Sequence, residues 1–153
     1  MGSFKMKIRL SNCFWLVIPL LAWNIALAPK LTLVEVTSDA HSPAWLLAAE
    51  NLTRIVVFAF PLLLALQVKD RLGKTGLAIY LVGILIYFAS WIPLVWIPQS
   101  NWSQYSAALL MPRITPLLAF MGIALIGHSR FYAFATVVFI ILHTIHGIQN
   151  LGV

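Results

Sequence analysis

Charged side chains are scarce in this sequence. Lys, Arg, Asp and Glu make up 9% of the 153 residues, whereas hydrophobic residues make up 61%. A soluble domain carries roughly 25% charged residues, which cover its surface. A chain this apolar cannot be a water-soluble monomer, and it is too hydrophobic to be intrinsically disordered. We therefore expect an integral membrane protein.

Cysteine is almost absent, and several familiar catalytic motifs are missing. Cys13 is the one cysteine, which excludes an intramolecular disulfide, a CxxC redox pair and a thiolate metal cage. Neither HExxH nor GxSxG occurs. Ten basic residues against four acidic ones give a formal charge of +6. Because the basic residues flank apolar segments, we attribute them to membrane orientation and expect no nucleic-acid partner.

Five apolar segments can be recognised, at about 14–28, 44–67, 76–97, 105–127 and 131–149. A helix needs ~20 residues to cross a hydrocarbon core of ~30 Å. Each segment should be helical, because a lone strand would leave its backbone polar groups unpaired in lipid. The sequence predicts an all-α, polytopic membrane protein, with about five transmembrane helices in a single domain that covers residues 1–153. Gly76, Gly83, Gly122 and Gly127 predict close helix packing.

The first apolar segment has some features of a signal peptide. Its basic start and the sequence Ala26-Leu27-Ala28 resemble a cleavable leader. Pro29 would directly follow the cut, and Trp23 and Asn24 interrupt the apolar run. We therefore expect a retained helix, followed by an external loop over residues 30–43.

The basic residues predict the orientation in a cell membrane. Lys30 lies between the first two segments, and the loop 98–104 and the C-terminus carry no basic residue. The positive-inside rule then places the N-terminus in the cytoplasm and the C-terminus outside. Seven basic residues fall on the cytoplasmic side: Lys5, Lys7, Arg9, Lys69, Arg71, Lys74 and Arg130. Trp45, Trp96 and Trp102 fall at the outer interface, as aromatic anchors do.

Several polar side chains lie within the apolar segments, where ionisable groups are costly and mark functional sites by default. With a rise of ~1.5 Å per residue, helices that run in both directions place these groups in the outer half of the membrane. Trp91 would supply an apolar wall beside them. The predicted ligand-binding residues are Asn24, Glu50, Asn51, Arg54, Trp91, Arg113, His143 and His146.

Charge balance within this set predicts an anion site. Glu50 and Arg54 are spaced i,i+4 and can pair on one helix face. Arg113 has no second membrane-embedded acid, so one positive charge needs water, Asp39, a lipid phosphate or an anionic ligand. The alternative is that Arg113 extends to the outer headgroups. Pro112 and Pro116 flank it and predict a kinked or opened helix.

The histidines leave several interpretations open. His143 and His146 share a polar stripe with Asn150, and His41 lies in the outer loop. His41, His143 and His146 are weak candidates for a metal site, and a haem would need an opposing axial ligand. Hydrogen bonds from the two helical histidines to Asn24, Glu50 or water are the commoner arrangement. No cofactor is favoured.

Three functions fit these observations. The first is a pocket that binds a small anionic or amphiphilic, lipid-like molecule. The second is an accessory subunit whose polar groups lock helices or dock a homo-oligomeric or other membrane partner. The third is a membrane enzyme that uses Glu50 with His143 and His146, with or without a metal. The sequence favours the pocket narrowly over the subunit, and membrane lipid is the expected surrounding partner.

Overall fold

Every regular element in the part of the chain that the computed structural model describes, residues 11–35 and 42–150, is helical. Short 3-10 turns cover Cys13–Leu16 (η1), Phe60–Leu63 (η3) and Trp102–Gln104 (η4). The α-helices are α1 (Ile18–Glu35), α2 (Ala44–Ala59), α3 (Arg71–Trp96), α4 (Ser106–Ile114), α5 (Pro116–Ile126) and α6 (Arg130–Asn150). The all-α class predicted from the sequence is confirmed.

Four helical stretches among these residues are long and apolar enough to cross a membrane. They are Ala44–Leu63, Arg71–Trp96, Ser106–Ile126 and Arg130–Gln149. The stretch Cys13–Leu27 is apolar but shorter. Composition and length thus support a membrane protein, with four described helical stretches that are able to cross the bilayer.

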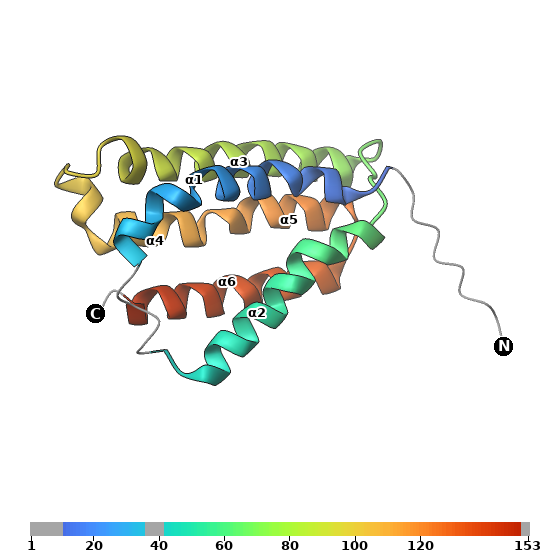
Figure 1. Ribbon diagram of the computed structural model, residues 1–153. Coiled ribbons are helices and arrows are strands. Elements are labelled where there is room, and N and C mark those ends of the chain that lie inside the picture. The colour runs from blue at the N-terminus through green and yellow to red at the C-terminus, as the bar shows by residue number, and fades with distance from the viewer. Residues whose placement is uncertain (1–10, 36–41, 151–153) are drawn as a thin grey trace.

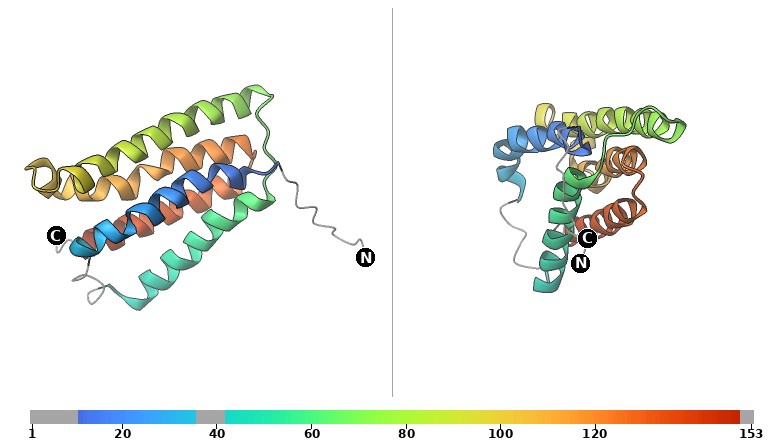
Figure 2. Two further views of the ribbon diagram at one scale, coloured as in Figure 1. Left: turned by 45° about the horizontal axis from the view of Figure 1, so that its top comes forward. Right: turned by 90° about the vertical axis from the view of Figure 1, so that its right-hand side faces the viewer.

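The helices lie in two groups (Figures 1 and 2). The first contains α3 and α5, which lie side by side, with α1 along α3. The second contains α6 and α2, and α2 crosses α6 obliquely. The α2–α3 and α5–α6 connections lie at one end of the molecule. We call it the basic end, because it carries the exposed residues Lys69, Arg71, Lys74 and Arg130. The opposite end carries the α3–α4 connection and the last turns of α6.

Three helix boundaries differ from the sequence prediction. α1 runs without interruption to Glu35, so residues 30–35 are helical rather than part of a loop; this stretch contains no proline or glycine that would end the helix. The second segment stops being an α-helix at Ala59, since Pro61 cannot donate a backbone hydrogen bond. α3 begins at Arg71, five residues earlier than predicted, because the Asp70 carboxylate caps its first turn through the Gly73 amide at 3.2 Å.

Backbone contact between α3 and α5 depends on glycines, as the sequence predicted. A Cβ atom on Gly122 would lie 2.5 Å from the backbone nitrogen of Tyr80, and one on Gly76 would lie 2.8 Å from the carbonyl oxygen of Gly122. Gly83 similarly faces the backbone of Ala119. Small residues let helix backbones approach closely, which maximises dispersion contacts where lipid supplies no hydrophobic drive.

At the basic end, backbone and side-chain contacts tie the connections together. Asn12 and Ala65 form an antiparallel bridge that attaches the residue before η1 to the segment after η3. His128 ends α5 with a positive φ of 50°, and Ser129 N–H donates to Ala124 O at 3.0 Å, as in a Schellman cap. His128 Nε2 lies 2.9 Å from Asp70 Oδ2. This contact links the α5–α6 turn to the first turn of α3.

The glycine contact gives a first prediction. Gly122→Ala places a methyl group against the rigid backbone of α3 and should lower the free energy of unfolding by about 1–3 kcal/mol. Gly127→Ala is the matched control, because the three atoms nearest to its new Cβ belong to the Leu64 side chain, with Cδ1 at 2.8 Å, and not to a helix backbone. Unfolding titrations in detergent measure both changes. Equal stability of the two variants would contradict the packing argument.

The Asp70–His128 contact gives a second prediction. The hydrogen bond from His128 lowers the pKa of Asp70 below its ordinary value of 3.8. The folded state therefore keeps this carboxylate charged at pH values where the unfolded chain binds a proton. The resulting stabilisation is present above pH 3.8 and is lost as the pH falls through the lowered pKa.

Asp70→Asn should remove this acid dependence while retaining the cap, since Asn caps helices as well as Asp. Thermal unfolding of wild type and variant across the acid range tests this. The two stability curves should converge as the pH falls below 3.8, and curves that stay parallel would rule the contribution out.

Candidate functional site

Glu50 on α2 lies at the centre of a buried polar cluster. The residue is 1% exposed, and both of its carboxylate oxygens have partners. His143 Nδ1 lies 2.8 Å from Oε1, and His146 Nδ1 lies 2.6 Å from Oε2. The Arg54 guanidinium pairs with Oε1. We call Glu50, Asn51, Arg54, His143 and His146 the α2–α6 cluster.

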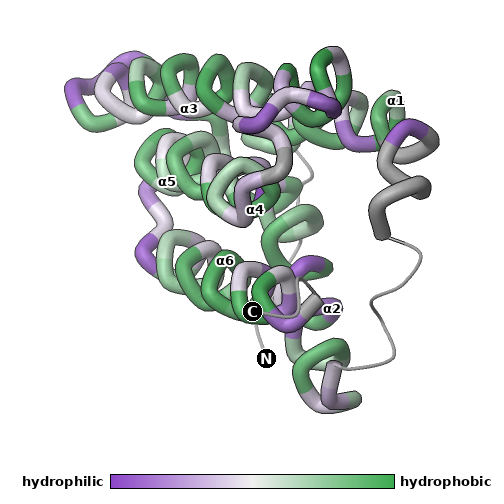
Figure 3. The backbone as a smooth tube through the Cα atoms, turned by 90° about the vertical axis from the view of Figure 1, so that its left-hand side faces the viewer, coloured by the Kyte–Doolittle hydropathy of each residue, from purple (hydrophilic) through white to green (hydrophobic). Residues whose placement is uncertain are grey.

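Helical spacing explains how each helix presents its part of the cluster. Glu50 and Arg54 stand at i,i+4 on α2, and the structure contains the ion pair expected from that spacing. His143 and His146 stand at i,i+3 on α6 and therefore face the same side. Figure 3 looks onto the end of the molecule opposite the basic end and shows hydrophilic stretches of α2 and α6 next to each other.

The histidine tautomers follow from the chemistry of the carboxylate. An ionised carboxylate can only accept hydrogen bonds, so each imidazole donates its Nδ1 proton to Glu50. The His143 ring is also held by stacking on Phe139, with ring centroids 5.4 Å apart and planes 12° apart. Both rings are thus oriented from α6 toward α2, and the Glu50 charge is satisfied by three donors.

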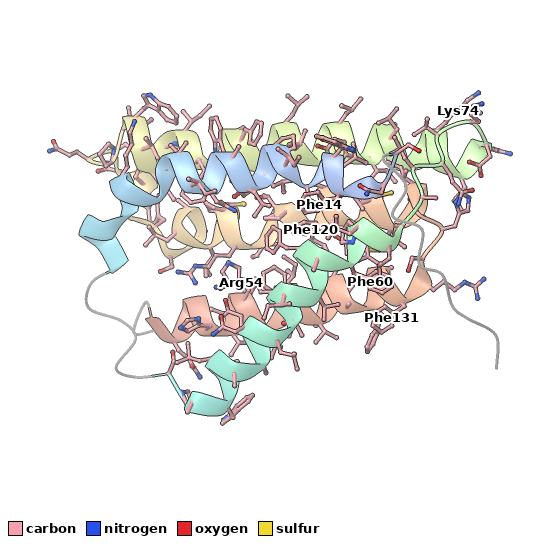
Figure 4. The ribbon with its side chains drawn as sticks, turned by 45° about the vertical axis from the view of Figure 1, so that its right-hand side comes forward. Phe14, Arg54, Phe60, Lys74, Phe120 and Phe131 are labelled. Atoms are coloured by element: carbon pink, nitrogen blue, oxygen red, sulfur yellow. The ribbon has the colours of Figure 1, made fainter. Side chains whose placement is uncertain are left out.

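The cluster is charge-balanced when its histidines are neutral, because the Glu50 carboxylate offsets the Arg54 guanidinium. The Arg54 side chain is 45% exposed, and Figure 4 shows it on the side of α2 that faces α6. Its Nη1 also donates to Asn51 Oδ1 at 3.3 Å. Among the described residues these two partners leave three of its five N–H donors for other groups.

Arg113 is placed beside this cluster from another helix. A Cβ atom on the buried Gly147 would lie 2.9 Å from Arg113 Nε, so the guanidinium stem passes directly over that glycine. Gly147 follows His146, which binds Glu50. The absence of a side chain at Gly147 lets α4 bring a second cation to the last turns of α6.

Asn24 and Trp91 belong to a different set of contacts. Asn24 Oδ1 accepts a hydrogen bond from the Tyr87 hydroxyl, and the Trp91 ring packs edge-on against Tyr87 at 6.1 Å. Sequence reasoning missed Tyr87, although its position four residues before Trp91 on one helix face was a usable signal. His41 lies outside the described residues.

The predicted break in the fourth segment occurs at Thr115. α4 ends at Ile114 and α5 begins at Pro116, as expected beside Pro112 and Pro116. The Thr115 hydroxyl donates to Met111 O at 2.8 Å and lies 3.3 Å from the Ser90 hydroxyl on α3. The Thr115 side chain at the interruption is therefore bonded back to the last turn of α4 and lies against α3.

The described residues contain no group of three or more His, Cys, Asp or Glu side chains that could hold a metal ion. The structure therefore adds no support for the metal hypothesis. Two imidazoles share one carboxylate here, an arrangement that resembles the hydrogen-bonded outer shell of a metal site.

No protein-family model matches the chain, and comparisons with curated proteins and with solved structures gave no match. The cluster must be interpreted from its own geometry.

The cluster gives a third prediction. Glu50→Ala removes the two histidine–carboxylate hydrogen bonds between α2 and α6 and leaves the one from the Tyr132 hydroxyl to the Val57 carbonyl. Such interhelical bonds contribute about 0.6 kcal/mol each on average and up to about 1.7. We expect the free energy of unfolding to fall by about 1–3 kcal/mol, measured by titration with a denaturing detergent. Asn51→Ala is the control, because Asn51 is exposed and bonds only within α2. An equal loss in the two variants would show that the buried carboxylate does not join the helices.

Proposed function

We propose that this protein is a small multi-pass membrane protein that binds a small anionic or amphiphilic molecule at the α2–α6 cluster, in the outer half of the membrane. The observation that carries the proposal is the Arg54 guanidinium, which lies within a span, is 45% exposed, and retains donors beyond its bonds to Glu50 and Asn51. An exposed guanidinium at this depth favours an anionic partner, because hydrocarbon does not solvate it.

The chemistry of the cluster suits a carboxylate or a phosphate. Guanidinium is planar and offers paired donors that match two oxygens of either group. Glu50 orients Arg54, and the two histidines hold Glu50 against α6. Arg113 adds a second cation next to Gly147. A ligand would bind there at a lower cost in side-chain entropy, since the side chains that contact it are already held in place by their neighbours.

The orientation and the fifth span belong to the same proposal. The exposed basic residues of the α2–α3 and α5–α6 connections lie at one end of the molecule, and the exposed Trp45, Trp96 and Trp102 lie in elements that begin or end at the other. With the positive-inside rule, this distribution favours a cytoplasmic basic end. α1 lies parallel to α3 along its length, so we propose it as a fifth membrane-embedded helix, with the N-terminus inside and the C-terminus outside.

A structural lock without a ligand is the second candidate. It is favoured by the saturation of the Glu50 carboxylate, whose two interhelical bonds hold α2 to α6. A lock predicts that loss of Glu50 destabilises the protein. It also predicts that truncating Arg54, which bonds only within α2, changes no binding property.

The fourth prediction separates these two functions. We expect inorganic phosphate or octanoate to raise the thermal stability of the detergent-purified protein, by about 2.7 kcal/mol at 100 times the dissociation constant. Arg54→Ala and Arg113→Ala should each lose this stabilisation while still inserting into membranes. Native mass spectra of wild type, released from mild detergent, would reveal a natural ligand as a defined added mass.

Arg130→Ala is the control for nonspecific anion effects, because Arg130 is exposed at the basic end. It should respond to both probes like wild type. Stabilisation that persists in both the Arg54 and Arg113 variants would reject the anion site. A wild-type protein that responds to neither probe and carries no added mass would move support to the lock.

A further inference from the structure

An apolar groove lies between α1 and α3, away from the α2–α6 cluster. Its volume is about 510 Å³, within the usual range of ligand sites. It is lined by Trp23, Leu85, Phe88, Ala89, Ile92 and Trp96. None of these residues belongs to the cluster proposed above to bind an anion, so the groove is an independent feature.

The shape of the groove follows from residue size and helical spacing. Its α3 residues recur at i, i+3, i+4, i+7 and i+11, which places them on one face. Trp23 of α1 stacks on Phe88, with ring centroids 4.4 Å apart, and lies 6.4 Å from the Trp96 ring. Ala89 is small and exposed between these larger side chains. The aromatic rings form rigid walls, and Ala89 leaves the space between them open.

The length of the groove matches half of a membrane. From Leu85 to Trp96 there are eleven helical steps, which correspond to ~16 Å along α3. One leaflet contributes half of a hydrocarbon core of ~30 Å, or ~15 Å. Trp96 is the last residue of the membrane-spanning stretch Arg71–Trp96, so the groove extends from the membrane interface toward the midplane.

A cation marks the interfacial end of the groove. Lys30 Nζ lies 5.4 Å from the centre of the Trp96 ring, and the Lys30 side chain is exposed. The groove is therefore apolar along its length and positive at its mouth. Its occupant should have one extended apolar chain and a negatively charged head, and in a membrane this is the chemistry of an anionic phospholipid.

We propose that the α1–α3 groove binds one anionic phospholipid, with an acyl chain against Phe88, Ala89 and Ile92 and its phosphate beside Lys30. The site selects for charge through Lys30 and for chain shape through the gap that Ala89 leaves. An ordinary annular lipid differs, because it exchanges over the whole surface and has no dependence on either residue.

The fifth prediction tests this site by native mass spectrometry of protein taken from bilayers with equal phosphatidylglycerol and phosphatidylcholine. Wild type should retain one lipid, with phosphatidylglycerol favoured about fivefold, the effect of one lysine near an anionic headgroup. Ala89→Phe fills the groove and should abolish retention. Lys30→Gln should keep a lipid but lose the preference for phosphatidylglycerol.

Two matched variants serve as controls. Ala78→Phe adds the same ring to an exposed position of α3 outside the groove, and Lys74→Gln removes a charge from the other end of α3. Both should retain lipid like wild type, and thermal unfolding should show that all four variants fold. Equal retention by wild type and Ala89→Phe, or an unchanged lipid preference in Lys30→Gln, would overturn the proposal. The Arg54 and Arg113 variants should retain this lipid, so the two sites can fail separately.

Discussion

A carboxylate within an apolar helix must find its counter-charge and its hydrogen bonds inside the protein, because lipid offers neither. Glu50 imposes this constraint on α2 and α6. Its two oxygens accept from two imidazoles of α6 and one guanidinium of α2, which fixes the rotation of both helices about their axes. The oblique helix α2 packs mainly against α6, and a second hydrogen bond, from the Tyr132 hydroxyl to the Val57 carbonyl, joins the two helices away from this cluster.

The α3–α5 pair is held by a different force. Its helices meet through Gly76, Gly83 and Gly122, where backbone atoms approach closely and dispersion replaces the hydrophobic effect. The molecule therefore combines a tightly packed apolar pair with a second pair joined by charge-assisted hydrogen bonds. The α2–α6 cluster and the α1–α3 groove lie on these separate groups, and their proposed ligands would bind without sharing a residue.

Both proposed sites carry their cations toward the end of the molecule opposite the basic residues of the loops. Lys30 stands over Trp96 at the mouth of the groove, and Arg54 and Arg113 approach the last turns of α6. The cations of the two sites would recognise different ligands. Lys30 is an exposed point charge suited to a headgroup at the interface, whereas Arg54 offers a directional fork deeper within a span.

The sequence alone determined the helical class, the approximate spans and the contacts between near neighbours. Hydrocarbon thickness and backbone hydrogen bonding require helices of known length, and i,i+4 geometry pairs Glu50 with Arg54 in any such helix. Pro112 and Pro116 predicted a kinked or opened helix beside Arg113, and the interruption lies two residues later, at Thr115. Helix boundaries depend on more than hydropathy: the apolar run places the start of the third helix at Gly76, whereas the Asp70 cap starts it five residues earlier.

Only the tertiary structure decided which distant residues meet. His143 and His146 reach Glu50 across 93 and 96 residues, whereas Asn24 meets Tyr87 instead. The groove beside Ala89 likewise exists only because Trp23 of α1 stacks on Phe88 of α3. Local pattern specifies the face of a helix, but which faces meet depends on crossing angles and axial rotation. Those are set by the packing of all the helices together, and a single sequence does not display them.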